Sequence, residues 1–128
     1  MPDNPILKKL QIKSGQRGII LNAPESYQSV LVQLPQDVDV AEALEGQFDF
    51  IHYFVTQKAE LERQAPELKA AMKPKGMLWV SYPKGKALPT DLNRDIIRAT
   101  LESSGLGLRA VSLVAIDDVW SALRLKIE

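Results

Sequence analysis

Several residue types that would support catalysis or anchoring are missing from this chain or rare in it. It has no cysteine, which excludes disulfides, thiol nucleophiles and thiolate metal sites, and its single histidine excludes a histidine-rich zinc site. Sixteen basic side chains balance sixteen acidic ones, so no net charge draws the chain to nucleic acid or to a membrane surface. No apolar run is long enough to span a bilayer, and the N-terminus lacks the apolar segment of a secretion signal. We therefore expect a cytoplasmic protein of bacterial type with neither kind of partner.

The composition is otherwise that of an ordinary globular domain. The chain has 128 residues, of which 45% are hydrophobic and 25% charged. This length suits one domain over residues 1–128 with one sizeable core, and the balance of apolar and charged residues argues against disorder.

Short apolar segments, several of them aromatic or β-branched, indicate the strands. They predict strands over residues 18–21, 38–40, 48–55, 77–82, 106–116 and 119–127. Strands that alternate with helices imply right-handed crossovers and a mostly parallel sheet, with helices on both faces. The last two strands follow each other around a short turn, so we expect them to form an antiparallel hairpin.

Apolar residues at helical spacing indicate the helices. A short helix is predicted over residues 25–30, because Pro24 suits the first helical position. Longer helices are predicted over 58–72 and over 90–102, with Thr90 as the N-cap of the second. We expect Pro66 to kink the first of these helices or to split it. The Lys-Pro-Lys-Gly turn at 73–76 should then end it.

Four segments resemble those of S-adenosylmethionine-dependent methyltransferases. Residues 10–26, L-Q-I-K-S-G-Q-R-G-I-I-L-N-A-P-E-S, resemble the first strand and first loop of that family. Residues 46–55, G-Q-F-D-F-I-H-Y-F-V, resemble its fourth strand. Residues 68–83, L-K-A-A-M-K-P-K-G-M-L-W-V-S-Y-P, resemble the helix, turn and fifth strand, and residues 116–125, I-D-D-V-W-S-A-L-R-L, resemble the last hairpin. The pattern also resembles small uncharacterised bacterial proteins of a domain-of-unknown-function family.

This resemblance implies a compact, methyltransferase-like α/β fold. The fold would be a three-layer, Rossmann-like arrangement whose mostly parallel sheet ends in an antiparallel hairpin. Because a typical methyltransferase domain is longer, at least one strand–helix unit should be shortened here. The resemblance also implies an acidic residue at the end of the second strand that would hold the cofactor ribose, and either Asp39 or Glu42 could take that position.

The first loop departs from the family pattern. The resemblance implies an acidic residue where this chain has Ile20, and three glycines where it has Asn22, Pro24 and Ser26. Glycines let the backbone approach a cofactor, whereas a proline ring and two side chains occupy that space. We therefore expect a non-catalytic or repurposed domain that binds a protein partner or a small ligand and holds no cofactor. Two alternatives stay open: an active enzyme that binds S-adenosylmethionine through an atypical loop, and a homodimeric structural module joined through its last hairpin.

Candidate site residues follow the carboxyl ends of the parallel strands, where open α/β sheets bind ligands. The candidates are Asn22, Glu25, Ser26, Tyr27, Thr56, Gln57, Ser81, Tyr82, Lys84 and Lys86. Glu25 or Tyr27 could orient a ligand or act as acid or base, although Glu25 could equally complement a helix dipole and Asn22 cap a turn. Thr56 and Gln57 could contact a ligand or cap the next helix. Lys84 and Lys86 could hold an anion or simply be solvated.

Three further features have structural interpretations. His52 could be a buried base, but its position in the middle of a strand favours a hydrogen-bonded core histidine. Trp79 and Trp120 are expected in the core or against the sheet, with a dimer surface as the alternative. The pair at 117–118, Asp-Asp, is a weak signal for a cation site.

Overall fold

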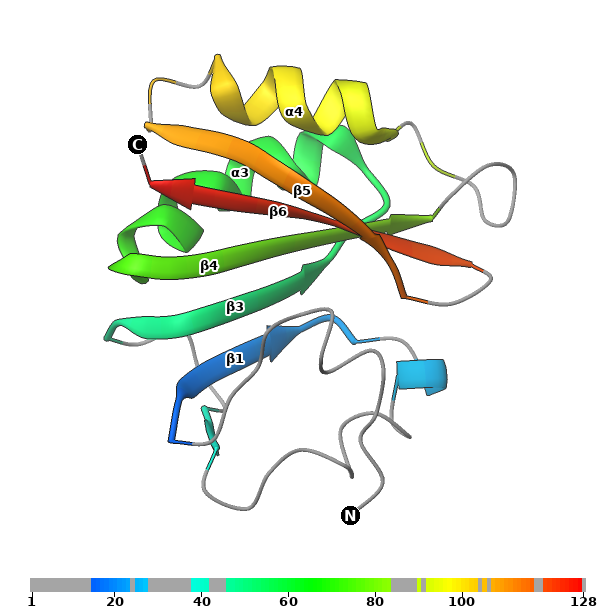
Figure 1. Cartoon of the computed structure of the whole chain (residues 1–128). Helices are drawn as coiled ribbons and strands as arrows, with labels where there is room; N and C mark the ends of the chain where they lie inside the picture. Colours follow the sequence, from blue (N-terminus) through cyan, green and yellow to red (C-terminus); the bar gives the residue numbers. More distant parts are fainter. Residues whose placement is uncertain are drawn as a thin grey trace.

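The computed structural model describes residues 15–23, 25–27, 38–41, 46–83, 90, 92–103, 105, 107–116 and 119–127. Figure 1 shows one twisted sheet with two helices packed along it. The strands are β1 (Arg17–Leu21), β2 (Asp39–Val40), β3 (Phe48–Phe54), β4 (Met72–Pro83), β5 (Leu108–Ala115) and β6 (Trp120–Ile127). The helices are the 3-10 helix η1 (Glu25–Tyr27), α3 (Lys58–Ala70) and α4 (Arg94–Glu102).

The sheet has the order β2-β1-β3-β4-β6-β5. The four strands from β2 to β4 are parallel to their neighbours, and β6 runs antiparallel to both β4 and β5. The predicted fold class, a mostly parallel sheet that ends in an antiparallel hairpin, is therefore confirmed. The six strand positions predicted from the sequence each contain an observed strand, although the limits differ.

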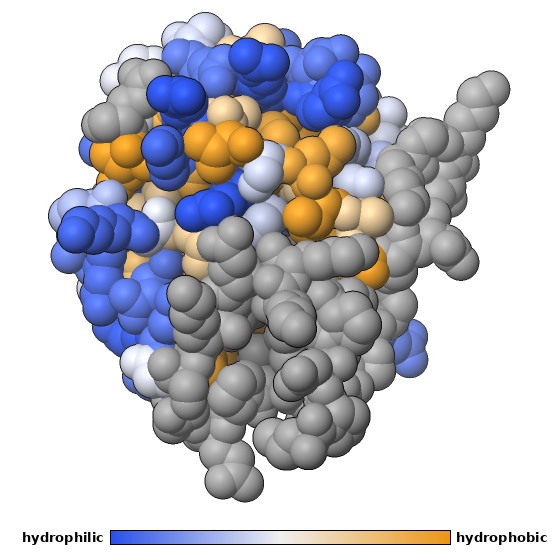
Figure 2. Space-filling model, viewed as in Figure 1, coloured by the Kyte–Doolittle hydropathy of each residue, from blue (hydrophilic) through white to orange (hydrophobic). Residues whose placement is uncertain are grey.

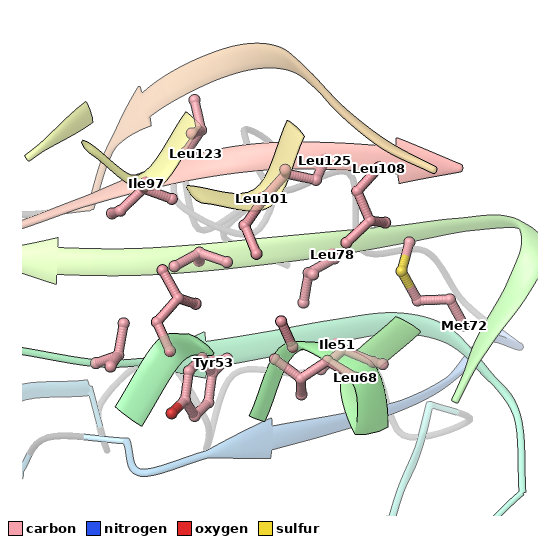
Figure 3. Close-up of a cluster of buried hydrophobic side chains, with 14 of the residues drawn as sticks. Ile51, Tyr53, Leu68, Met72, Leu78, Ile97, Leu101, Leu108, Leu123 and Leu125 are labelled. Carbon is pink, nitrogen blue, oxygen red and sulfur yellow. The ribbon is translucent and has the colours of Figure 1, made fainter. Parts of the chain in front are cut away.

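One face of the sheet is covered by α3 and α4. Leu61 and Leu68 of α3 and Ile97 and Leu101 of α4 are fully buried against aliphatic residues of the strands. Figure 3 shows Leu68, Ile97 and Leu101 pointing into the space between the helices and the sheet. Both helices lie on the same face because each crossover advances in the same direction across the sheet, and right-handed crossovers then place their helices on one side.

The opposite face carries a second, largely aromatic cluster. Its buried members are Tyr27, Phe50, Phe54, Met77, Trp79, Ile116, Trp120 and Ala122. Both tryptophans are therefore core residues, as expected from the sequence. Tyr27 comes from η1, so the segment directly after β1 covers part of this face.

The structure differs from the sequence-based expectations for α3 at two points. The helix is one continuous element through Pro66, so it is not split there. Pro66 lies on the exposed side, where the carbonyl that loses its helical partner can be solvated. The predicted turn at 73–76 belongs to β4, because Phe48 pairs with Met72 and Phe50 already pairs with Met77. These four residues form a bulge, and a side chain at Gly76 would lie only 2.9 Å from the Phe48 carbonyl oxygen.

The start of α4 also differs from the prediction. The N-cap is Asn93, whose side-chain oxygen accepts a hydrogen bond from the Ile96 N–H at 2.8 Å, and the helix begins at Arg94. Thr90 instead donates its hydroxyl proton to the Thr56 carbonyl at 2.5 Å and accepts a hydrogen bond from the Leu92 N–H at 3.0 Å. Thr90 therefore fastens the segment before α4 to the end of β3. Within the described residues, no helix combines the length and the apolar character that a membrane crossing requires.

Candidate functional site

The chain leaves β1 through a left-handed turn at Asn22. Its φ is +58°, and it is the one non-glycine residue with positive φ in the part of the chain that the structure describes. Asparagine tolerates this conformation better than most residues with a side chain. The side-chain amide of Asn22 donates a hydrogen bond to the Phe54 carbonyl at 3.4 Å, which ties the end of β1 to the end of β3. A position that the family resemblance assigns to glycine therefore keeps a conformation typical of glycine.

Tyr27, five residues further on, folds back across β3. Its side chain is 1% exposed, and its hydroxyl oxygen lies 3.1 Å from Nδ1 of His52. The other ring nitrogen of His52, Nε2, lies 2.5 Å from Oγ of Ser81 on β4. One ring nitrogen of a neutral histidine donates and the other accepts, so both contacts are satisfied in either tautomer. The three side chains form a continuous buried hydrogen-bonded chain from η1 through β3 to β4.

Aromatic rings surround this hydrogen-bonded chain. Tyr27 meets the rings of His52 and Phe54 edge-on, each with a centroid distance of 5.0 Å. His52 stacks on Phe54 at 4.3 Å, and Trp120 meets Phe54 edge-on at 5.2 Å. Such ring arrangements stabilise beyond the area they bury. The loop after β1 is therefore held in place by packing as well as by hydrogen bonds.

Burial fixes the protonation state of this group. Desolvation lowers the pKa of His52 to about 3 and raises the pKa of the Tyr27 hydroxyl. At neutral pH His52 is therefore uncharged, and it is 0% exposed. A general base must reach the proton that it abstracts, so His52 acts as a structural residue in this arrangement. The expectation of a hydrogen-bonded core histidine is confirmed.

The remaining candidates near the ends of β1 and β3 lie at or near the surface. Glu25 is exposed in η1, and the side chain of Ser26 is outside the described part of the chain. Thr56 is half-buried and contributes its carbonyl to the Thr90 hydroxyl. Gln57 occupies the N-cap position of α3 but makes no side-chain capping bond. Together with the Asn22 contact, the Thr90 contact fastens the segments at this edge of the sheet to one another.

A hollow of about 460 Å³ lies at the carboxyl end of β4. It is lined by Tyr82, Pro83, Thr90, Leu92, Asn93, Arg94, Asp95 and Leu113. Burial raises the pKa of the Tyr82 hydroxyl, so it stays protonated and can donate a hydrogen bond. Lys84 and Lys86 follow β4 directly in the sequence, and both lie outside the described residues.

Acidic candidates do not gather at the carboxyl edge in the part of the chain that the structure describes. Asp39 pairs with Arg17 at the start of β1 and forms an ion pair with it at 3.7 Å, at the amino end of the parallel strands. This position does not fit an acid that ends the second strand and holds a ribose. Glu42 and the aspartates at 117–118 lie outside the described residues, as does Pro24. Among the described side chains, no three His, Asp or Glu residues are grouped closely enough to hold a metal ion.

Sequence reasoning named Tyr27, His52 and Ser81 separately and did not connect them. Their spacing of 25 and 29 residues gives no local signal. An indirect signal exists: His52 and Ser81 fall on adjacent parallel strands, and Tyr27 follows the neighbouring strand on the other side. A strand order of β1-β3-β4 brings such residues together.

The comparisons with known proteins support the fold. No family model matches the chain, and no curated protein matches its sequence. Among solved structures, the glycopeptide N-methyltransferase MtfA in complex with S-adenosylmethionine is 11% identical and has a TM-score of 0.62, with 96% of this chain and 86% of that chain covered. The complex of DhpI with S-adenosylhomocysteine is 10% identical, with a TM-score of 0.62 and coverage of 96% and 83%.

An S-adenosylmethionine-dependent methyltransferase from Aquifex aeolicus is 17% identical, with a TM-score of 0.58 and coverage of 96% and 88%. The agreement with these three structures extends over nearly the whole chain. The protein therefore has the Rossmann-like α/β fold of S-adenosylmethionine-dependent methyltransferases.

Proposed function

We propose that this protein is a methyltransferase-fold domain that has given up the usual cofactor position and binds a small ligand or a protein partner instead. The observation that carries the proposal is the buried contact between Tyr27 and His52. In the related fold, the turn after the first strand and the segment behind it approach the cofactor. Here the same segment is anchored to β3 by a tyrosine that is almost fully buried.

The side chains at the end of β1 support this proposal. Ile20 is half-buried against the aromatic cluster and offers no carboxylate to a ligand. Asn22 keeps the turn, but its amide is engaged with the Phe54 carbonyl. The chemistry that would grip an amino acid group or a ribose is therefore missing at Ile20, and the side chain at Asn22 already serves a structural role.

The hollow at the carboxyl end of β4 is the place where we expect a ligand. Ligands of open α/β sheets bind beyond the carboxyl ends of the strands, and this hollow lies there. Asn93 and Arg94 offer amide and guanidinium N–H groups along its wall. Lys84 and Lys86 would add positive charge from the adjoining segment, so a small anionic ligand is the class we propose.

The left-handed turn at Asn22 favours a second candidate function. A retained turn would suit an active methyltransferase that holds S-adenosylmethionine through an atypical loop, and two of the similar structures contain this cofactor or its product. In that case the segment from Asn22 to Tyr27 would meet the cofactor. The two candidates make opposite predictions for cofactor binding.

A thermal-unfolding titration separates them. S-adenosylmethionine and S-adenosylhomocysteine would each be added up to millimolar concentration, with an authentic methyltransferase measured in parallel as a positive control. A ligand at about 100 times its dissociation constant stabilises a fold by about 2.7 kcal/mol. For 128 residues, an unfolding entropy of about 2.1 cal/mol/K per residue converts this into a shift of about 10 °C.

We expect no shift with either compound, and a smaller, saturable shift with inorganic phosphate that is lost in the double variant Lys84→Gln, Lys86→Gln. A saturable shift with S-adenosylmethionine would refute the proposal and favour the enzyme. The variant Asn22→Gly, which keeps the turn, should then retain the shift, whereas Asn22→Leu should lose it.

A further inference from the structure

The outer edge of β5 is the most exposed apolar surface of the described structure. β5 pairs with β6 on one side and ends the sheet on the other. Val111 and Leu113 are 38% and 41% exposed, and Val40 on the opposite edge strand is the one other large apolar residue that is exposed among the described residues. An edge strand with apolar side chains is a template for pairing with another chain.

Val111 and Leu113 lie beside a groove between β5 and α4. Two hollows of about 440 and 460 Å³ follow one another along it, and Leu113 lines both. Their floor includes Tyr82, Leu92 and Leu123, which are buried apolar residues. Figure 2 shows apolar surface gathered below a hydrophilic band in the region that β5 and α4 occupy in Figure 1.

The backbone of β5 is open along only part of this edge. The Ala110 N–H donates to the Glu102 carboxylate at 3.1 Å, so a side chain of α4 closes the first half of the edge. A bulge lies at Val111, where Ala110 and Ser112 face consecutive residues of β6. At the far end the Ile116 N–H donates to the Trp120 carbonyl, on the β6 side. Alternation along the strand then directs the main-chain groups of Leu113 and Ala115 outward.

We propose that a second copy of this chain pairs with this open half of β5. The two strands would run antiparallel about a two-fold axis at Val114, so that Leu113 lies opposite the partner's Ala115. Each subunit then supplies the same two outward residues, as an isologous interface requires. The two sheets would join into one, and each Leu113 would be covered by the groove edge of the other subunit. This inference does not depend on the proposed function, because its test is the oligomeric state, although Leu113 also lines the hollow in which we expect the ligand.

The charges favour a second copy as the occupant. Arg109 is the one charged residue of β5, and it lies five residues from the proposed axis, so no like charges face each other across the paired strands. The exposed side of α4 carries two arginines and two acids that pair within the helix, Arg94 with Asp95 and Arg98 with Glu102, so these four residues leave no net charge that would repel the same face of a second copy.

The size of the surface sets the expected affinity. The open half of β5, about four residues, is about 14 Å long, and the helix layer adds about 10 Å of height to the edge. The resulting contact is smaller than a standard specific interface, which buries about 800 Å² per partner. We therefore expect a reversible dimer with a dissociation constant in the micromolar range.

Sedimentation velocity on the full chain, from about 1 to about 300 µM, tests this proposal. The wild type should shift from monomer to dimer with concentration. Leu113→Asp should raise the dissociation constant at least about 30-fold, because two leucines lose their burial in each dimer. Ala115→Pro should weaken the dimer as well, because it removes an outward N–H that β6 does not use. Val40→Asp, an equally exposed aliphatic residue on the other edge, is the matched control and should leave the dimer unchanged.

Circular dichroism would establish that each variant is folded. A wild type that stays monomeric at every concentration would overturn the proposal, and the edge would then fit a strand from a different protein. A dimer that survives Leu113→Asp and Ala115→Pro, or one that Val40→Asp removes, would also overturn it, because the interface would lie elsewhere.

Discussion

The chain has a single histidine, His52. The loss of stability in acid therefore tests whether His52 is buried in the hydrogen-bonded chain with Tyr27 and Ser81. Burial lowers the pKa of His52 to about 3, whereas an unfolded histidine titrates at 6.5. Between these two values the unfolded chain binds a proton that the folded chain does not, so stability rises with pH and falls on acidification. From about pH 7.5 to about pH 4.5 we expect a loss of about 2.6 kcal/mol, from a slope approaching 1.4 kcal/mol per pH unit.

The titration of Asp49 and Glu102 does not hide the loss of stability that His52 causes between about pH 7.5 and about pH 4.5. Hydrogen bonds from the backbone N–H of Arg17 and of Ala110 lower the pKa of Asp49 and of Glu102, respectively. A carboxylate whose pKa is lowered in the folded state contributes stability above its unfolded pKa and loses it as the pH falls through the folded pKa. The loss of stability from these carboxylates lies mainly below about pH 4.5, which is lower than the pH range in which protonation of unfolded His52 destabilises the fold.

Urea unfolding followed by circular dichroism at several pH values would measure the slope. His52→Gln should be less stable than wild type near neutral pH, but its stability should change little between about pH 7.5 and about pH 4.5. Tyr27→Phe, which keeps the imidazole buried, should retain the wild-type slope. A wild-type stability that does not change over this range, or an imidazole that titrates near 6.5 in a nuclear magnetic resonance experiment, would refute the reasoning.

Three further substitutions test other parts of the structure by the same unfolding measurement. Tyr27→Phe should cost about 1 to 3 kcal/mol, because Nδ1 of the buried His52 loses its partner; a neutral effect would mean that packing alone holds the loop. Gly18→Ala should cost about 1 to 3 kcal/mol, because the new methyl group would lie 2.2 Å from the ring of Phe50, which is fully buried; an unchanged midpoint would contradict this packing. Asn93→Ala should cost about 1 kcal/mol, because α4 loses its N-cap, and Asn93→Asp should restore most of it.

The order and type of the elements could be predicted because each signal is local. The aromatic and β-branched run at 48–55 and the apolar run at 77–82 identify buried strands without knowledge of their neighbours. The predicted ends of the helices were less accurate where a contact with a distant part of the chain determines them. Thr90 is a good capping residue by type, but its hydroxyl is used by the Thr56 carbonyl, so the helix begins later at Asn93. The glycine at 76 was expected to end a helix, whereas its role is to let a bulge fold back on β3.

The candidate site could be located from the sequence but not assembled. The turn after β1 and the end of β4 were both expected at the carboxyl edge of the sheet, and both lie there. The sequence could not show that Tyr27 and Ser81 meet at His52, because that contact depends on the strand order and on the direction in which η1 turns. Asp39 fits the expected position of the ribose-binding acid by its place in the sequence, yet the register of β2 against β1 puts it at the opposite end of the strands.

The uneven distribution of aromatic residues between the two faces of the sheet has a consequence for spectroscopy. Both tryptophans of the chain, Trp79 and Trp120, belong to the cluster on the face that Tyr27 covers, and neither belongs to the face covered by α3 and α4. Tryptophan fluorescence therefore reports on one face of the sheet, while the far-ultraviolet signal of the helices reports mainly on the other. Coincident transitions from these two signals would mean that the faces unfold as one cooperative unit, and separated transitions would mean that the aromatic face opens independently.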